Sequence, residues 1–163
     1  MRYHNITKDD MLNGDGLRVV LWVSGCSHHC EGCHNQITWD PAGGILFDKN
    51  AQEELAQELQ KDYVSGITFS GGDPLFLQNR ETIASLVHWV HSSFPTKTIW
   101  LYTGYCFEEI QDISFLPLID VLVDGKFEKE LYDPNLAWKG SSNQRVIDIK
   151  KTFETGHCVL RQC

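Results

Sequence analysis

Three cysteines, Cys26, Cys30 and Cys33, lie within eight residues of one another in the spacing C-x3-C-x2-C. They come directly after an apolar run, residues 19–23, that has the composition of a buried strand. Three thiols at the end of one strand can bind one inorganic centre. A [4Fe–4S] cluster usually takes four thiolates, so a loop with three leaves one iron open to an external ligand. An open coordination position distinguishes a catalytic metal site from a closed structural one.

Three other arrangements of these thiols compete with an iron–sulfur cluster. A zinc site would add His28, His29 or His34 to the three cysteines. A disulfide knot would need an oxidising compartment. Free buried thiols do not normally gather in a polar, glycine-containing loop, because cysteine behaves as a small hydrophobic residue. The loop by itself favours iron–sulfur and leaves zinc open.

The chain of 163 residues predicts a single domain, residues 1–163, since it is long enough for a sizeable core and contains no linker or repeat. A net charge of −8 argues against a general nucleic-acid binder. The N-terminus lacks the apolar segment of a signal peptide, and no apolar run reaches the ~18 residues that span a bilayer. We therefore expect no membrane association and a cytoplasmic location, where thiols stay reduced.

Predicted strands and helices alternate along the chain. Residues 5–16 are polar and rich in turn signals. Strands are predicted at residues 17–23, 66–69, 97–102, 119–123 and 145–149, and helices at residues 50–61, 80–91 and 107–112. This alternation predicts an α/β fold with a mostly parallel sheet and flanking helices. About five strands are too few for a closed eight-stranded barrel, so we expect an open partial (β/α) barrel.

Polar, glycine-containing segments follow the predicted strands. Residues 70–74 read Ser-Gly-Gly-Asp-Pro, residues 103–105 read Thr-Gly-Tyr, and residues 124–126 read Asp-Gly-Lys. Adjacent glycines let the backbone approach a ligand closely, although such a segment alone is more typical of an ordinary turn. Ligands of α/β sheets and barrels bind outside the carboxyl ends of the strands. We therefore expect these segments to line one mouth together with the cysteines.

The cysteine spacing resembles the cluster loop of the radical S-adenosylmethionine (SAM) enzymes. Residues 70–74 resemble the G-G-E-type motif of the same family, with Asp73 in place of the glutamate. Residues 100–105, 124–126 and 140–145 are similar to elements of its activating enzymes for glycyl radical proteins. The resemblance covers nearly the whole chain. It is closest to the branch whose protein substrate is anaerobic ribonucleoside-triphosphate reductase.

This resemblance implies a fold of the radical SAM type, an open partial barrel. It implies one [4Fe–4S] cluster per chain, held by Cys26, Cys30 and Cys33, with SAM on the fourth iron. An electron from reduced flavodoxin or a similar donor would split SAM into methionine and a 5′-deoxyadenosyl radical, which takes a hydrogen atom from a glycine of the reductase. No catalytic side chain is implied beyond the cluster and SAM, because the cofactor carries the difficult chemistry. Another glycyl radical enzyme or a small molecule as substrate, and a zinc-binding interaction module, remain alternatives.

The resemblance also implies which residues contact SAM. The implied contacts are main-chain groups of Gly32, Cys33 and His34, the amino-group site at Gly71, Gly72 and Asp73, then Thr103, and finally Asp124 and Lys126 near the SAM carboxylate or the incoming peptide. No cation site is carried over, because Tyr102 stands where larger activating enzymes place an acidic residue.

Several other residues near these segments allow two interpretations each. His28, His29 and Asn35 are expected either to tune the cluster through hydrogen bonds or to be exposed loop residues. Tyr102 and Tyr105 are expected either to pack or to contact adenine. Of the remaining cysteines, we expect Cys106 to be an inert buried thiol and Cys158 and Cys163 to lie in the C-terminal tail.

Overall fold

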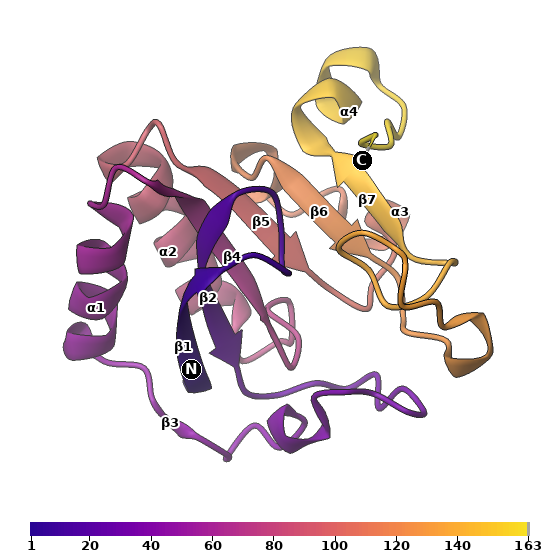
Figure 1. The fold of residues 1–163 in the computed structure, drawn as a ribbon, viewed down its shortest axis with the longest axis horizontal. Helices are drawn as coiled ribbons and strands as arrows, with labels where there is room; N and C mark the ends of the chain where they lie inside the picture. Colours follow the sequence, from indigo (N-terminus) through magenta and orange to yellow (C-terminus); the bar gives the residue numbers. More distant parts are fainter. Residues whose placement is uncertain (163) are drawn as a thin grey trace.

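Seven strands form one sheet in the spatial order β3-β1-β2-β4-β5-β6-β7 (Figure 1). The computed structural model describes residues 1–162. The strands are β1 (Arg2–Asp10), β2 (Leu17–Val23), β3 (Ile45–Leu46), β4 (Val64–Gly71), β5 (Thr98–Tyr102), β6 (Val121–Asp124) and β7 (Arg145–Asp148). The α-helices are α1 (Lys49–Leu59), α2 (Arg80–Ser93), α3 (Phe107–Ile110) and α4 (Ile149–Thr155), and 3-10 helices lie at Gln36–Thr38 (η1), Leu116–Leu118 (η2) and Lys129–Leu131 (η3).

The four central strands run parallel, and antiparallel pairs flank them on both sides. β2 pairs with β4, β4 with β5, and β5 with β6 in parallel. β1 pairs antiparallel with both β2 and β3, and β7 pairs antiparallel with β6. The carboxyl ends of β2, β4, β5 and β6 therefore lie at one edge of the sheet, as the alternation of strands and helices predicted. The segment between β2 and β3 passes beneath this edge in Figure 1.

The first strand corrects the expectation for the N-terminal region. The predicted turn-rich segment, residues 5–16, begins with the second half of β1, and the turn starts only after Asp10. Within β1 only Tyr3 and Ile6 are buried. A strand with so few apolar positions has no recognisable period-two pattern. Its hydrogen bonds to β2 and β3 hold it in the sheet, and these are long-range contacts that no local pattern reveals.

The two faces of the sheet have different coverings, because side chains alternate along each strand. On one face, Leu21, Phe69 and Leu101 pack in the main hydrophobic core with Leu55 of α1 and Val87 of α2. On the opposite face lies a smaller cluster of Trp100, Val121, Val123 and Val146, with Tyr102 and Trp138 against it. Loops rather than helices cover this second face.

A buried arginine fixes one of these loops. The guanidinium of Arg18 donates hydrogen bonds to the Thr68 hydroxyl at 2.8 Å and to the Asp15 carbonyl at 3.0 Å. It also lies 5.3 Å from the ring centroid of Trp100. Burial lowers the pKa of Arg18 to about 10, because removing the guanidinium from water disfavours its charged form. The loop between β1 and β2 is thus held over the sheet.

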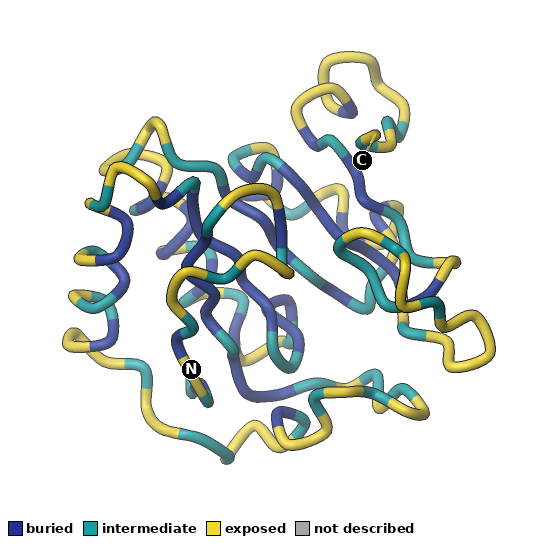
Figure 2. The backbone as a smooth tube through the Cα atoms, viewed as in Figure 1, coloured by how far each residue is buried: buried dark blue, intermediate teal, exposed yellow. Residues whose placement is uncertain are grey.

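Figure 2 shows that the central strands β2, β4, β5 and β6 are mostly buried. The segments beyond their carboxyl ends, residues 24–44 and 126–144, are mostly half-buried or exposed. In the part of the chain that the structure describes, no helix is both long and apolar enough to cross a membrane.

Candidate functional site

The three cysteines lie in one loop, residues 24–39, which leaves the carboxyl end of β2; we call it the cysteine loop. Backbone hydrogen bonds join its two ends, from the Gly25 N–H to the Thr38 carbonyl at 2.7 Å and from the Cys26 N–H to the Trp39 carbonyl at 3.1 Å. Gly25 has a φ of 99°, a conformation that glycine adopts without steric cost. The two ends of the loop are therefore held together at its base.

The thiols of Cys26, Cys30 and Cys33 are half-buried and form no disulfide. Burial raises the pKa of the Cys26 thiol. The Asn35 N–H donates a hydrogen bond to the sulfur of Cys33 at 3.4 Å. Within residues 1–162, no three histidine, cysteine, aspartate or glutamate side chains are grouped to hold one metal ion. A [4Fe–4S] cluster binds each thiolate at a different iron, so three accessible thiols in one loop are a donor set that fits a cluster.

A cavity of about 510 Å³ adjoins the cysteine loop. Cys33 and His34 form part of its wall, and Trp22, Ser70 and Tyr102 line it from the carboxyl ends of β2, β4 and β5. Much of the rest of the lining comes from the segment between β6 and β7, including Phe127, Tyr132, Trp138, Gly140 and Gln144. The volume falls within the range of roughly 300–1,000 Å³ that is typical of small-molecule sites. Of the predicted metal and SAM-binding residues, Cys33 and His34 line this cavity.

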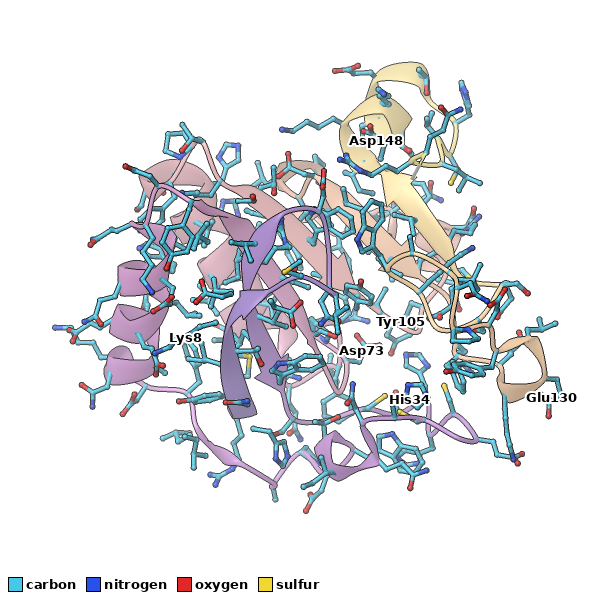
Figure 3. The ribbon with its side chains drawn as sticks, viewed as in Figure 1. Lys8, His34, Asp73, Tyr105, Glu130 and Asp148 are labelled. Atoms are coloured by element: carbon cyan, nitrogen blue, oxygen red, sulfur yellow. The ribbon has the colours of Figure 1, made fainter. Side chains whose placement is uncertain are left out.

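Asp73 is a buried junction between three segments. Its carboxylate, in a residue that is 1% exposed, lies 2.7 Å from Nε2 of His28 in the cysteine loop. It also accepts hydrogen bonds from the Thr103 hydroxyl at 2.9 and 3.0 Å, from the Gly104 N–H at 3.0 Å and from the Leu75 N–H at 2.7 Å. The Asp73 carboxylate therefore joins the cysteine loop, the segment after β4 and the segment after β5 through hydrogen bonds. Figure 3 shows Asp73 and Tyr105 at this end of the sheet.

Gly71 and Gly72 allow close approach of two backbone segments. A Cβ on Gly71 would lie 2.5 Å from the Val23 nitrogen, and one on Gly72 would lie 2.4 Å from the Gly25 carbonyl oxygen. The N–H groups of Gly72 and Asp73 donate to the carbonyls of Val23 and Gly25, at 2.8 and 2.7 Å. The two glycines thus bring the end of β4 against the base of the cysteine loop.

Asp124 is buried and Lys126 is exposed, although both belong to the segment at the end of β6. Asp124 is 1% exposed and accepts hydrogen bonds from the Arg145 guanidinium at 3.0 Å and from the Phe107 N–H at 2.7 Å. Lys126 is exposed. Neither side chain is among the residues that line the 510 Å³ cavity.

Gly32 and His34 lie at the outer part of the cysteine loop. Gly32 has a φ of 72°, and a Cβ there would lie 3.2 Å from the Lys129 side chain. The His34 ring centroid lies 5.6 Å from that of Phe127 and 5.7 Å from that of Tyr132. The outer part of the loop is thus in contact with the segment between β6 and β7.

His28, His29 and Asn35 have different surroundings. The side chain of His28 is 7% exposed and paired with Asp73, so it is not an exposed loop residue. His29 is exposed, at a φ of 46°. Asn35 lines the 510 Å³ cavity.

Several lining and supporting residues were not predicted as site residues. Trp22 gave only the signal of a core strand, and Trp138 lies in a segment without a clear pattern. Arg145 was expected in a polar loop and a strand, but not as the partner of Asp124. The parallel ends of β2, β4 and β5 point to Trp22 and Ser70 only once the strand order is known.

The remaining cysteines require one correction. Cys106 is exposed rather than buried, because it precedes the first turn of α3 at the surface. Cys158 is half-buried and packs against the main core. Cys163 lies outside the described residues.

A family model described as a 4Fe-4S single cluster domain matches residues 12–147, so the chain has a domain of this class, as the cysteine spacing predicted. The chain is 52% identical over 146 residues to the anaerobic ribonucleoside-triphosphate reductase-activating protein of Enterobacteria phage T4, covering 90% of this chain and 93% of the relative. Proteins of the same name from Haemophilus influenzae and Escherichia coli K12 are 44% and 43% identical over 154 residues, covering 92% of this chain and 99% and 100% of the relatives. The chain belongs to the family of anaerobic ribonucleoside-triphosphate reductase-activating proteins.

Proposed function

We propose that this protein activates anaerobic ribonucleoside-triphosphate reductase by generating a glycyl radical on it. In this proposal the protein is a radical SAM oxidoreductase of the activating-enzyme type, with one [4Fe–4S] cluster on Cys26, Cys30 and Cys33. The observation that carries the proposal is the 510 Å³ cavity that has Cys33 and His34 in its wall at the carboxyl ends of the central parallel strands. The names of the relatives identify the reductase as their partner.

When bound, the cluster and SAM supply one-electron cleavage of SAM to methionine and a 5′-deoxyadenosyl radical, which abstracts a glycine hydrogen. In this proposal the protein's own groups bind and orient SAM. The aromatic side chains of Tyr102 and Trp138 are suited to packing against adenine. The Tyr102 hydroxyl already donates to the Trp138 carbonyl at 2.7 Å, so the phenol ring is held in place.

The predicted amino-group site uses the main chain in this proposal. An ammonium group needs hydrogen-bond acceptors, and the N–H groups of Gly72 and Asp73 are already bonded to β2 and the loop base. Carbonyl oxygens at Gly71 and Gly72 are therefore the groups that we propose for SAM's amino group. Asp73 and Thr103 support this segment through their mutual hydrogen bonds. The main chain of Gly32, Cys33 and His34 completes the SAM site beside the cluster.

The carboxylate of Asp124 is held by Arg145 and the Phe107 N–H, so we assign it a supporting role. Lys126, two residues further on and exposed, is the cation that we propose for the SAM carboxylate or the incoming peptide. A lysine ammonium forms charge-assisted hydrogen bonds with a carboxylate.

We propose that the partner's glycine segment enters along the cavity. A second cavity of about 240 Å³ shares Trp22 and Asn35 with the first, so the two adjoin. Leu12 lines the first cavity and is 80% exposed, and Ile37 lines the second and is 75% exposed. Exposed apolar side chains beside a cavity are typical of a protein-binding surface. An open partial barrel of the radical SAM type, with a mouth wide enough for a peptide, is the fold that we propose for this sheet.

The electron donor that we propose is reduced flavodoxin or a protein of similar potential. Iron–sulfur potentials extend to about −700 mV, so a low-potential donor matches the task. The cysteine loop has exposed residues, among them Ser27 and Glu31, and we propose that the donor approaches this side of the loop. We propose a cytoplasmic location, where both partners and reduced thiols occur.

The test is anaerobic reconstitution with iron and sulfide, followed by addition of SAM, a reductant and purified reductase. We expect a 4Fe–4S signature that changes with SAM, and a glycyl radical signal on the reductase by electron paramagnetic resonance. One tightly held zinc that does not respond to SAM would overturn the proposal and favour the zinc-binding interaction module. SAM cleavage without a radical on this reductase would instead direct the search to another glycyl radical enzyme.

A further inference from the structure

His28 lies at the middle of the first half of the cysteine loop, two residues after Cys26 and two before Cys30. Its neighbours in sequence, Ser27 and His29, are exposed. The His28 side chain is only 7% exposed, because it turns away from solvent toward the ends of β4 and β5. The position of this imidazole therefore affects the backbone that carries two of the three thiols.

The polar contact of the His28 side chain is with the buried carboxylate of Asp73. Nε2 of His28 lies 2.7 Å from Oδ2 of Asp73, and Asp73 is 1% exposed. A buried carboxylate is costly unless hydrogen-bond donors surround it. The other donors, from Leu75, Thr103 and Gly104, belong to the segments after β4 and β5. His28 is the donor that brings the cysteine loop to this carboxylate.

Packing fixes the imidazole as closely as the hydrogen bond does. The Tyr105 ring meets it edge to face, with centroids 4.7 Å apart and planes at 76°. A Cβ on Gly104 would lie 2.3 Å from Cδ2 of His28, so the segment after β5 reaches the ring only because residue 104 is glycine. The ring is thus confined by the same segment that supplies Thr103 to Asp73.

We propose that His28 is a positioning residue, which sets the spacing of Cys26 and Cys30 by tying the cysteine loop to Asp73 at the ends of β4 and β5. This inference rests on the proposed function, because it concerns the thiols that would hold the cluster. Functional groups must be held to about 0.5 Å, and a displacement of about 1 Å can reduce activity on the order of a hundredfold. The hydrogen bonds at the base of the loop and the contacts of its outer part with the segment between β6 and β7 leave the stretch between Cys26 and Cys30 to be fixed by His28.

The test compares His28→Ala and His28→Gln with the wild type and with His29→Asn. Glutamine retains an N–H donor that can reach Asp73, and His29→Asn is the matched control in the same loop at an exposed position. In the apoprotein, we expect amide hydrogen exchange across residues 26–33 to be at least tenfold faster in His28→Ala. After reconstitution, we expect His28→Ala to retain less than half the wild-type iron, with a shifted midpoint potential and an altered signal of the reduced cluster.

His28→Gln is expected to restore most of the iron and the exchange protection, and His29→Asn to match the wild type. Wild-type exchange, iron content and potential in His28→Ala would overturn the inference. If His28→Ala does not fold, His28→Gln decides, since a glutamine variant that folds but loses iron as completely as Cys30→Ala contradicts a role based on the hydrogen bond to Asp73. Failure of the wild type itself to bind a cluster would instead count against the proposed function.

Discussion

The carboxylate of Asp124, at the end of β6, accepts a hydrogen bond of 3.0 Å from Nε of Arg145, at the start of β7. On its outer side the same guanidinium donates to the Glu108 carboxylate at 3.0 and 2.8 Å. The Asp124 and Glu108 carboxylates raise the pKa of Arg145. This one side chain therefore joins β6, β7 and α3 beside the candidate site.

Replacing Arg145 by alanine is expected to destabilise the protein strongly. Asp124 is 1% exposed, and removing one partner of a buried ion pair leaves a charge without compensation, at a cost of about 3 kcal/mol. Urea unfolding of the apoprotein measures the effect. The control is Lys49→Ala, whose pair with Glu53 is 4.0 Å long and largely exposed, so its change is expected to be below about 0.5 kcal/mol. Equal stability of the two variants would contradict the assignment.

The Glu108 carboxylate gives a pH dependence with a definite sign. The hydrogen bond from Arg145 lowers the pKa of Glu108 below its ordinary value of 4.5. A carboxyl group with a lowered folded pKa stabilises the fold above its unfolded pKa, and this contribution disappears as pH falls through the folded value. We expect Glu108→Gln to lower Tm slightly at pH 7 and progressively less below pH 4.5, because the side chain is 58% exposed and screened by solvent. Thermal scans across pH, with Glu154→Gln on α4 as the control, measure this difference. The same decrease in Tm at acid and neutral pH would be inconsistent with it.

Cys30→Ala is expected to abolish cluster binding and SAM cleavage. Removing one of three thiolates leaves a second iron without its protein ligand. The matched control is Cys106→Ala, since Cys106 is an exposed thiol before α3 and is expected to retain wild-type iron content. Iron analysis and chromatographic detection of 5′-deoxyadenosine are the measurements. Deoxyadenosine production by Cys30→Ala would disprove the ligand assignment.

Gly104→Ala is expected to act through the His28 ring. The new Cβ would lie 2.3 Å from Cδ2 of His28, and overpacking of this kind costs about 1–3 kcal/mol. The double variant His28→Ala/Gly104→Ala removes the clash, so its loss of stability is expected to be smaller than the sum of the two single losses. Urea unfolding of the four proteins measures the coupling. Strict additivity would mean that the two residues do not interact.

Lys126→Ala is expected to leave the cluster intact and weaken turnover. Loss of one charge-assisted contact to a carboxylate, worth about 1.4 kcal/mol, corresponds to about a tenfold lower rate. Iron content and the rate of SAM cleavage separate the two effects, with Lys49→Ala as a surface-charge control. A wild-type rate would mean that Lys126 is only surface charge.

The sequence alone determined the features that depend on residues close to one another along the chain. The spacing of Cys26, Cys30 and Cys33 predicted an iron–sulfur cluster, and the matching family model is that of a 4Fe-4S single cluster domain. The apolar run at residues 17–23 defined β2 with its observed bounds, and the repeat of apolar residues defined α2 to within two residues. Such elements are predictable because their apolar residues follow a local pattern. In a helix the buried side chains recur every three or four residues, and a buried strand is a short, nearly continuous apolar run.

Only the tertiary structure decided which polar groups meet. His28 and Asp73 are 45 residues apart in sequence, and Asp124 and Arg145 are 21 apart. In the first pair the sequence singled out both residues but not the contact between them, and in the second it indicated Asp124 as a site residue but not Arg145 as its partner. β1 was missed for the same reason, since its place in the sheet depends on hydrogen bonds to β2 and β3 rather than on its own pattern. A buried charge must find a donor wherever the strand order brings one, and strand order is a property of the whole chain.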